Sequence, residues 1–265
     1  MLRFFHRTWL FLSILSFGSA FIPPKLLWLA GVWTFTIPIF GIGLFVFLLV
    51  YLLRREKRSL LYTLLVFLLG IPHWLATVNF SFSTDESGTD LKVLSYNLHY
   101  FYSADKLRFV PEQRETFMAF IKNEQPDFLC LQEFHDPGQR LSKWLQKKGY
   151  TNQRFLWIRP ERGLAIFSRF PITSYQETSF ENSPQNGCQQ VNIDLQNGKS
   201  LSLVNVHLQS FILRNFNKMR LRKVNDLIHA LGQGMIHQSE QVEWLLSENK
   251  SNTSAILICG DHNST

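Results

Sequence analysis

Charged residues and cysteines are both scarce in this chain of 265 residues. Asp, Glu, Lys and Arg together make up 18% of the sequence, whereas hydrophobic residues make up 46%. A disordered chain shows the opposite balance, with low hydrophobicity and high charge. The chain has 3 cysteines, and no two of them form a Cys-x-x-Cys pair. Their number and spacing argue against a disulfide framework and against a zinc site built from thiolates.

Positive charge is not spread evenly along the chain. The formal net charge is +7, from 27 basic and 20 acidic residues. Residues 1–89 hold 7 of the basic and 3 of the acidic residues, and the rest of the chain holds 20 and 17. The first third of the chain therefore contributes more than its share of the net positive charge. The high isoelectric point is for this reason a weak argument for a nucleic-acid partner.

Long uncharged hydrophobic runs fill most of the first eighty residues. Leu26–Leu53 and Leu60–Val78 contain no Asp, Glu, Lys or Arg, and Thr8–Ile22 is a shorter run that Pro23 and Pro24 close. A membrane-spanning helix needs about 20 predominantly apolar residues. We therefore predict a transmembrane anchor of two to three helices over residues 1–80. Such an anchor would make this a multi-pass protein of the cell (inner) membrane.

The loop between the two long runs predicts the orientation of the anchor. Its sequence is Arg54-Arg55-Glu56-Lys57-Arg58, and loops rich in Lys and Arg stay in the cytoplasm. The polar segment 81–90 is typical of a linker. Residues 91–265 then form a domain on the extracytoplasmic, periplasmic side. A cleaved signal peptide over Leu2–Ala20 is an alternative for the first run, and it leaves the domain on the same side.

Beyond the linker, short apolar runs alternate with helical patterns. We expect strands at Leu91–Tyr96, Asp127–Leu131, Leu164–Phe167, Val191–Leu195, Ser200–Leu208 and Ala255–Cys259. We expect helices at Pro111–Glu124, Leu141–Lys148, Arg214–Leu231 and Met235–Leu246. Asn197-Gly198 between two alternating runs predicts a hairpin. This order of elements predicts an α/β domain with helices layered around antiparallel sheets.

Polar residues gather where the predicted strands end. The strand-end motifs are Ser95-Tyr96-Asn97, Gln132-Glu133, Asn205-Val206-His207 and Gly260-Asp261-His262-Asn263. A carboxylate after an apolar strand is costly unless it is paired, solvated or bound to a metal. Carboxylate and amide oxygens suit Mg²⁺, and an imidazole suits a phosphate oxygen or a proton transfer. Each motif alone also fits a turn, a solvated loop or a buried histidine, so the combination carries the hypothesis.

The order of these motifs resembles the endonuclease/exonuclease/phosphatase superfamily, in its bacterial, membrane-anchored form. The matching segments are SYN (95–97), PDFLCLQE (126–133), GLAIFSRFPI (163–172), NVHL (205–208) and GDHN (260–263). The resemblance implies a DNase I-like two-sheet β-sandwich flanked by helices, here preceded by the transmembrane helical region. It also implies metal-dependent hydrolysis of phosphoesters, as in a phosphodiesterase, an endonuclease or a phosphatase.

The resemblance also assigns roles to single residues. Glu133 matches the main metal ligand, and Asn97 matches the residue that supports the metal site. His207 matches the histidine that contacts the scissile phosphate or the leaving group. Asp261 and Asn263 match the pair that orients the attacking water and the phosphate. The implied cofactor is Mg²⁺, with Mn²⁺ as the alternative.

The sequence departs from the family pattern at two places. Position 262 is His, where the family commonly has Phe. The sequence also ends at Thr265, whereas the family pattern continues to a Ser-Asp-His motif that supplies the catalytic base. We therefore expect the C-terminal part of the domain to be missing here. On that reading the 265-residue chain would itself bind metal poorly and have little activity.

Two classes of function remain open from the sequence. The first is a membrane-tethered phosphoester hydrolase that acts on nucleic acid or on a phosphorylated lipid headgroup, with no obligate protein partner. The second is a non-catalytic, membrane-anchored binding module that retains the fold. A basic cluster over 214–223 fits either a polyanionic partner or the solvated face of a helix. An integral transporter would need more spans than the three that the sequence offers.

Overall fold

The structure is a computed structural model of the whole chain. It describes residues 1–77, 91–103, 108–180, 183, 186–196, 198–210, 224–250 and 255–263, with side chains in the last helix from residue 229 onward. The chain divides into two compact units. One comprises Met1–Ser87 with Ile212–Ser239, and the other comprises Gly88–Phe211 with Glu240–Thr265. The predicted linker 81–90 and the basic cluster over 214–223 lie outside the described residues.

The first unit is helical. Its N-terminal helices are α1 (Leu2–Ser19), α2 (Trp28–Thr34), α3 (Ile37–Leu53), α4 (Lys57–Leu69) and α5 (Ile71–Thr77). The predicted run Leu26–Leu53 is broken between α2 and α3. Pro38 lies in the first turn of α3, where its missing N–H group has no helical partner to lose. The run Leu60–Val78 is broken at Gly70, and Pro72 follows two residues later.

The breaks affect the prediction of spanning helices. Within the described residues, no single helix is long and apolar enough to cross a membrane. The bent pair α2 and α3, with 47° between its two helices, meets the requirement of length and composition together. The structure therefore does not show the two to three separate spans that the sequence predicted.

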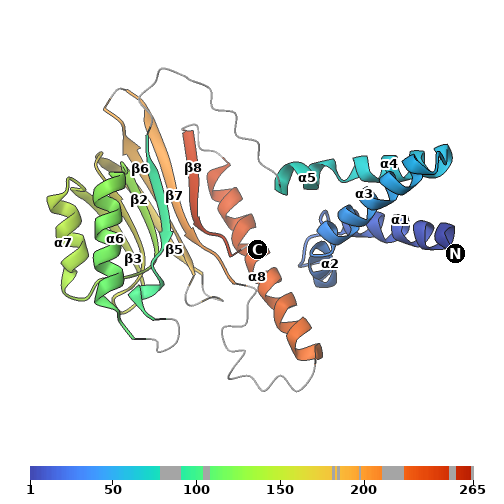
Figure 1. Cartoon of the computed structure of the whole chain (residues 1–265). Coiled ribbons are helices and arrows are strands. Elements are labelled where there is room, and N and C mark those ends of the chain that lie inside the picture. The colour runs from blue at the N-terminus through green and yellow to red at the C-terminus, as the bar shows by residue number, and fades with distance from the viewer. Residues whose placement is uncertain are drawn as a thin grey trace. The chain divides into compact units, whose positions relative to one another are not determined.

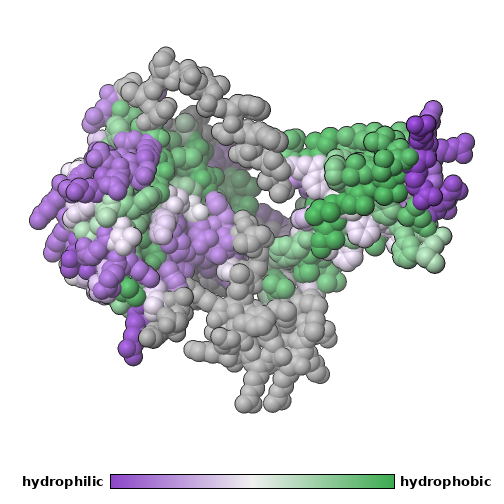
Figure 2. All heavy atoms as spheres, in the orientation of Figure 1, coloured by the Kyte–Doolittle hydropathy of each residue, from purple (hydrophilic) through white to green (hydrophobic). Residues whose placement is uncertain are grey.

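In the helical unit, many large apolar side chains are exposed and several polar side chains are buried, unlike in an ordinary soluble domain. Large apolar side chains lie on its surface, among them Leu26 at 76% and Leu53 at 83% exposed, and Figure 2 shows this unit as mostly hydrophobic. Polar side chains of α1 face inward instead. His6 Nε2 lies 2.8 Å from Thr63 Oγ1 of α4, and Ser16 Oγ lies 2.9 Å from Thr36 Oγ1. These hydrogen bonds add to the apolar contacts among Phe17, Leu44 and Val66 that also hold the helices together.

The second unit contains two mixed sheets (Figure 1). Its strands are β1 (Val93–Asn97), β2 (Phe128–His135), β3 (Asn152–Arg159), β4 (Arg162–Ser168), β5 (Ile172–Ser179), β6 (Gly187–Asp194), β7 (Ser200–His207) and β8 (Ala255–Asp261). In the described part of the chain, one sheet has the order β1-β2-β4-β3 and the other β5-β6-β7-β8. β1 pairs with β2 and β7 pairs with β8 in parallel, while the remaining pairs are antiparallel. The predicted α/β architecture of two sheets with flanking helices is confirmed, but the sheets are mixed and not antiparallel as predicted.

Three apolar layers hold this unit together. Phe128, Cys130, Ile166 and Leu203 belong to the core between the sheets. On the outer face of the first sheet, the core includes residues of α6 (Pro111–Glu124) and α7 (Arg140–Lys147). On the outer face of the second sheet, Val204 and Val206 pack with Leu245 of α8 (Val224–Asn249). β2 therefore contributes to two cores at once, as expected of a strand buried on both faces.

Local chemistry explains the two helices beside the first sheet. α6 begins at Pro111, whose fixed φ suits the first helical turn, and ends where Gln125 adopts a left-handed conformation. α7 begins where the carboxylate of Asp136 accepts hydrogen bonds from the backbone N–H groups of Leu141 and Ser142. These bonds satisfy donors that a helix start otherwise leaves without partners.

Three elements differ from the predictions. The sequence analysis missed β3 and β5, which are edge strands without regular apolar alternation. It also predicted two helices, Arg214–Leu231 and Met235–Leu246, where the structure has the single helix α8. α8 runs through Gly232 and Gly234 without a break, and an internal glycine costs only about 1 kcal/mol relative to alanine. This cost is too small to divide the segment into two helices.

The buried cysteines generate a first prediction. Burial raises the pKa of the Cys188 thiol to about 12, and it raises the pKa of the Cys130 thiol well above its usual value. Because the thiolate is the nucleophile, we expect iodoacetamide at pH 8 to leave both residues unmodified in the folded protein and to modify both in guanidinium. Peptide mass spectrometry measures this. Modification of either thiol at the same rate with and without denaturant would contradict the described burial.

Candidate active site

The inner faces of the two sheets bring the strand-end motifs to one edge of the sandwich. Asn97 is the register partner of Gln132, and His207 is the register partner of Asp261. Side chains alternate between the two faces of a strand. Val93 in β1 and Leu203 in β7 belong to the core between the sheets. Asn97 and His207 lie an even number of residues beyond them, and they therefore share the inner face.

A bulge in β2 turns Glu133 toward the inner face, where Asn97 and His207 lie. Leu131 pairs with Ala165 and Phe134 pairs with Gly163, so two residues of β2 oppose one residue of β4. Glu133 has a φ of 47°, in the left-handed region that non-glycine residues adopt at a cost of about 1–3 kcal/mol. A regular strand would turn Glu133 to the side of Leu131, against the outer core. The bulge redirects its carboxylate toward the other motifs.

His207 lies between two carboxylates. Its Nε2 atom is 3.9 Å from Glu133 Oε1 and 3.8 Å from Asp261 Oδ2. The side chains of Glu133 and His207 are each only 7% exposed, whereas that of Asp261 is 27% exposed. Two acidic groups and one imidazole thus meet in a largely dry setting, where charges interact more strongly than in water.

Asn97 orients Asp261. Its Nδ2 donates a hydrogen bond of 2.7 Å to Asp261 Oδ2, and its Oδ1 accepts one of 2.9 Å from the backbone N–H of His99. The donor and acceptor roles of the Asn97 amide are therefore fixed by its partners. The other oxygen of Asp261, Oδ1, accepts a hydrogen bond of 3.0 Å from the backbone N–H of Asn263.

The structure places Asn263 at the rim of this cluster. Its side-chain Nδ2 donates a hydrogen bond of 2.7 Å to the carbonyl oxygen of Leu208, directly after β7. Asn263 therefore reaches Asp261 through its backbone, while its amide is bound to the chain next to His207. His262 is exposed.

His99 belongs to the cluster, and the sequence analysis did not single it out. Its Nδ1 lies 4.0 Å from Glu133 Oε2. The Nδ1 atom is buried and has no hydrogen-bond partner among the described residues. The only local signal is position, because His99 follows the predicted Asn97 by two residues. A buried nitrogen without a partner beside a carboxylate leaves room for a bound water or ion.

Two further residues, Gln132 and Asn205, hold the sheets together beneath the site. Both are almost completely buried. Gln132 Nε2 donates a hydrogen bond of 2.7 Å to Asn205 Oδ1, and Asn205 Nδ2 lies 3.2 Å from the carbonyl oxygens of Leu131 and Ala165. Gln132 precedes Glu133, and Asn205 lies two residues before His207. The amide contact therefore fixes the spacing between the two sheets next to both groups.

The donor chemistry of the cluster fits a hard divalent cation. Glu133 and Asp261 offer carboxylate oxygens, and Asn97 offers an amide oxygen with one remaining lone pair. Among the described residues, no group of three His, Cys, Asp or Glu side chains is arranged to enclose a metal ion. Mg²⁺ in proteins is commonly held by one or two carboxylates and keeps several waters. The cluster suits that kind of site, and the unpartnered Nδ1 of His99 faces it.

Comparison with protein families identifies matches in both units. A sequence model described as "Endonuclease/Exonuclease/phosphatase family" matches residues 94–265. A second, described as "Domain of unknown function (DUF8431)", matches residues 1–77. No curated protein matches the chain.

Solved structures show similarity at low identity. The human Nocturnin catalytic domain with bound sulfate is 16% identical, with a TM-score of 0.48 over 66% of this chain and 64% of that one. TDP2 from Caenorhabditis elegans is 19% identical, with a TM-score of 0.47 over 79% and 57%. An endonuclease/exonuclease/phosphatase from Beutenbergia cavernae is 20% identical, with a TM-score of 0.47 over 65% and 47%. This chain thus spans less than two thirds of each of these structures.

The contact between Gln132 and Asn205 predicts coupled losses of stability. Gln132→Ala and Asn205→Ala each leave buried polar groups without partners, so we expect each to cost about 2–3 kcal/mol. The double variant should cost less than the sum, by at least about 0.5 kcal/mol, because the two side chains share a hydrogen bond. Urea unfolding of the four proteins measures this coupling.

Asn192→Ala is the matched control for this cycle. The Asn192 amide donates a hydrogen bond to Ser174 at the protein surface, so its loss should cost less than about 0.5 kcal/mol. Strictly additive losses for Gln132 and Asn205 would show that the two amides do not act together.

Proposed function

Because the chain belongs to the endonuclease/exonuclease/phosphatase family, we propose that it hydrolyses phosphoesters at the cluster formed by Asn97, Glu133, His207 and Asp261. One observation carries the proposal. His207 Nε2 lies within 4 Å of two carboxylates that come from different sheets. A buried arrangement of this kind stabilises a fold poorly, whereas it suits a site that positions a phosphate, a water and a cation.

We assign the cation to the side of Glu133. Glu133 and the amide oxygen of Asn97 would hold Mg²⁺, with Mn²⁺ as the alternative, and waters would complete the coordination. When bound, the ion neutralises negative charge on the phosphate oxygens. The low exposure of Glu133 favours this role, because a buried carboxylate gains more from a nearby cation than an exposed one does.

The remaining groups act on the phosphate and the water. Asp261 is held by Asn97 Nδ2 and by the backbone N–H of Asn263. Its free lone pairs can accept a hydrogen bond from the attacking water and so orient it. A protonated Nε2 of His207 can donate a hydrogen bond to a phosphate oxygen or to the leaving group. Positioning of this kind typically contributes about 10²–10⁴-fold to a rate.

We further propose that the helical unit anchors the protein in a membrane. Exposed Leu and Phe side chains and inward polar contacts, such as His6 with Thr63, are an arrangement that suits lipid and not water. The bent pair α2 and α3 has the length and composition of a span. The basic loop Arg54–Arg58 favours a cytoplasmic position for that loop. A second crossing by the apolar run Leu60–Val78 would then bring the phosphoesterase domain to the extracytoplasmic side.

The proposal predicts the effect of substitutions in the cluster. We expect Glu133→Gln and His207→Ala each to lower kcat by about 10²–10³-fold, because each removes charge or a hydrogen-bond donor at the reacting phosphate. Chelation should abolish activity, and Mg²⁺ or Mn²⁺ should restore it. Hydrolysis of a generic phosphodiester by the purified protein measures all of these effects.

Glu161→Gln is the matched control. Glu161 also has a left-handed backbone, with a φ of 58°, but its side chain is exposed in the turn between β3 and β4. We expect this variant to keep its activity within twofold. A folded protein without any metal-dependent hydrolysis would contradict the proposal and favour the binding-module alternative.

The membrane proposal has its own test. Alkaline phosphatase fused after residue 265 should be active in a bacterial host, because that reporter folds only outside the cytoplasm, and carbonate should not extract the protein. Alanine at the four basic positions of Arg54–Arg58 should reduce the active fraction. Alanine at Lys122, Arg140, Lys143 and Lys147 is the control and should leave it unchanged. Extraction of the protein by carbonate would contradict membrane anchoring.

A further inference from the structure

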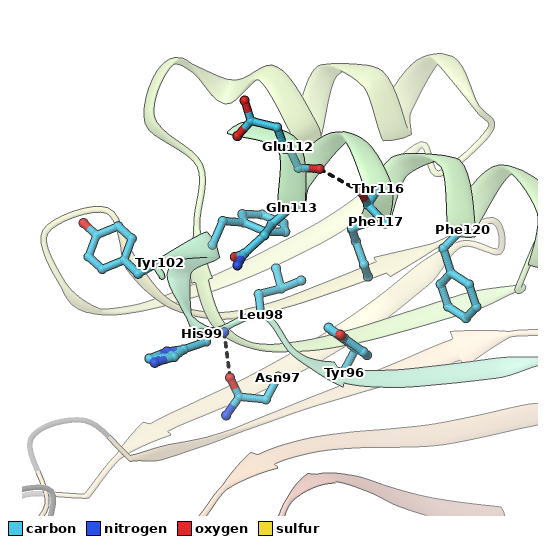
Figure 3. A pocket seen from close by; sticks show the side chains of 11 residues that line it. Tyr96, Asn97, Leu98, His99, Tyr102, Glu112, Gln113, Thr116, Phe117 and Phe120 are labelled. Atoms are coloured by element: carbon cyan, nitrogen blue, oxygen red, sulfur yellow. Dashed lines mark hydrogen bonds between the residues drawn. The ribbon is translucent and has the colours of Figure 1, made fainter. Parts of the chain in front are cut away.

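A cavity of about 720 Å³ adjoins the candidate active site. It lies between β1, the short helix η1 (His99–Phe101) and α6, and Figure 3 shows it from close by. Asn97 and His99 line the cavity and also belong to the site. The cavity is therefore close enough to Glu133 and His207 to hold another part of a substrate whose phosphate binds there. Its volume is within the range of ordinary ligand pockets.

Aromatic side chains supply one side of the cavity. Tyr96 is 49% exposed and Phe120 is 41% exposed, although both rings are large and apolar. Phe117 lies behind them, with its ring centroid 5.5 Å from that of Tyr96. In Figure 3, the rings of Phe117 and Phe120 come from α6 on the side of Tyr96. Exposed rings in a cavity offer flat faces on which a planar group can stack.

Polar groups supply the other side. Gln113 extends from α6 toward His99 and Tyr102 (Figure 3). The side-chain amide of Gln113 and the carboxylate of Glu112 have no hydrogen-bond or ion-pair partner among the described residues, and both residues line the cavity. The amide can donate and accept, and the carboxylate can accept. The cavity thus combines flat apolar faces with hydrogen-bonding groups that a ligand can satisfy.

The charge of the lining does not favour a second phosphate. Neither Lys nor Arg is among the lining residues, although the chain has 27 of them. Sites for phosphate usually present cations, and here the charged group is the carboxylate of Glu112. The group that fits is therefore uncharged. An acyl chain would be uncharged too, but it would cover Gln113 and Glu112 without forming hydrogen bonds, which is costly for polar groups.

The wall of the cavity is held in a fixed shape. His99, Tyr100 and Phe101 all have positive φ, between 46° and 55°. Arg162 of β4 holds this strained segment. Its guanidinium lies over the rings of Tyr100 and Tyr102, 5.2 Å and 5.3 Å from their centroids, and donates a hydrogen bond of 2.8 Å to the Tyr102 hydroxyl. Strain that the surroundings hold in place is typical of binding sites.

From these observations we propose that the cavity binds a nucleobase of the substrate, next to the phosphate that is hydrolysed. The proposal rests on the proposed phosphoesterase function. The base stacks on the aromatic side formed by Tyr96 and Phe120, and its polar edge pairs with Gln113 or Glu112. The substrate class is therefore a nucleotide, either free or within a nucleic acid, and not a phospholipid.

The test begins with binding, which needs no turnover. Isothermal titration of the purified protein compares a nucleoside 5′-monophosphate with ribose 5-phosphate, which has the same phosphate and no base. We expect the nucleotide to bind about tenfold more tightly or better, as is usual for base stacking on aromatic side chains. A single-stranded oligonucleotide and a short-chain phosphatidic acid are measured beside them. Tighter binding of the oligonucleotide assigns the source to nucleic acid, and equal binding assigns it to free nucleotides.

Variants assign the effect to the cavity. Phe120→Ala and Gln113→Ala should each remove most of the difference between nucleotide and ribose 5-phosphate, while leaving the affinity for ribose 5-phosphate unchanged. Tyr175→Ala is the matched control, because Tyr175 is 56% exposed on β5 of the other sheet. We expect it to keep the full difference.

The outcomes separate the two proposals. Equal affinity for the nucleotide and ribose 5-phosphate, or tighter binding of phosphatidic acid than of either, would overturn the nucleobase assignment. If a generic phosphodiester is hydrolysed in that case, the phosphoesterase function stands alone. The protein could instead bind the base in a way that Phe120→Ala removes, and yet hydrolyse no phosphoester. That result would support the nucleobase assignment and contradict the proposed function.

Discussion

A strand cannot bury both Leu131 and Phe134 in the same core unless it carries an extra residue between them, because side chains alternate with a period of two. β2 meets this constraint with a bulge. Both side chains stay fully buried in the outer core, and that burial offsets the cost of the left-handed backbone at Glu133. Gln132 can then bind Asn205 between the sheets, and Glu133 can face His207. The packing of one strand thereby positions the buried acidic group on which the candidate site depends.

The same strand links the site to its surroundings. Gln132 joins the two sheets, so the distance between Glu133 of one sheet and His207 of the other is set by a buried hydrogen bond and not by a mobile loop. On the neighbouring strand, Asn97 connects the site to η1, whose strained backbone forms a wall of the adjoining cavity. Rigid elements thus hold both the acidic groups and the cavity, as preorganised sites require.

The sequence predicted features that depend on local signals. α6 was predicted with its observed bounds, because proline marks its start and its apolar positions share one face. The ends of β1, β7 and β8 were marked by polar residues after apolar runs. The predicted end of β2 at Leu131 was too early, because the strand continues through Gln132 and Glu133 to His135. The edge strand β5 was missed because it has no apolar alternation. The contact of Gln132 with Asn205 was not predicted, because it joins residues far apart in sequence. The two long apolar runs were predicted as unbroken helices, whereas the helices break near Pro38 and at Gly70.

The measurement that tests the central claim most directly is the binding of Mn²⁺, followed by electron paramagnetic resonance. The account predicts a specific site on the folded protein that Glu133→Gln removes or strongly weakens, and that the exposed-site variant Glu161→Gln leaves intact. Mg²⁺ should compete for that site. Mn²⁺ binding that survives the loss of the Glu133 carboxylate, or a folded protein that binds no Mn²⁺, would contradict the assignment of this cluster as a metal-dependent phosphoesterase site.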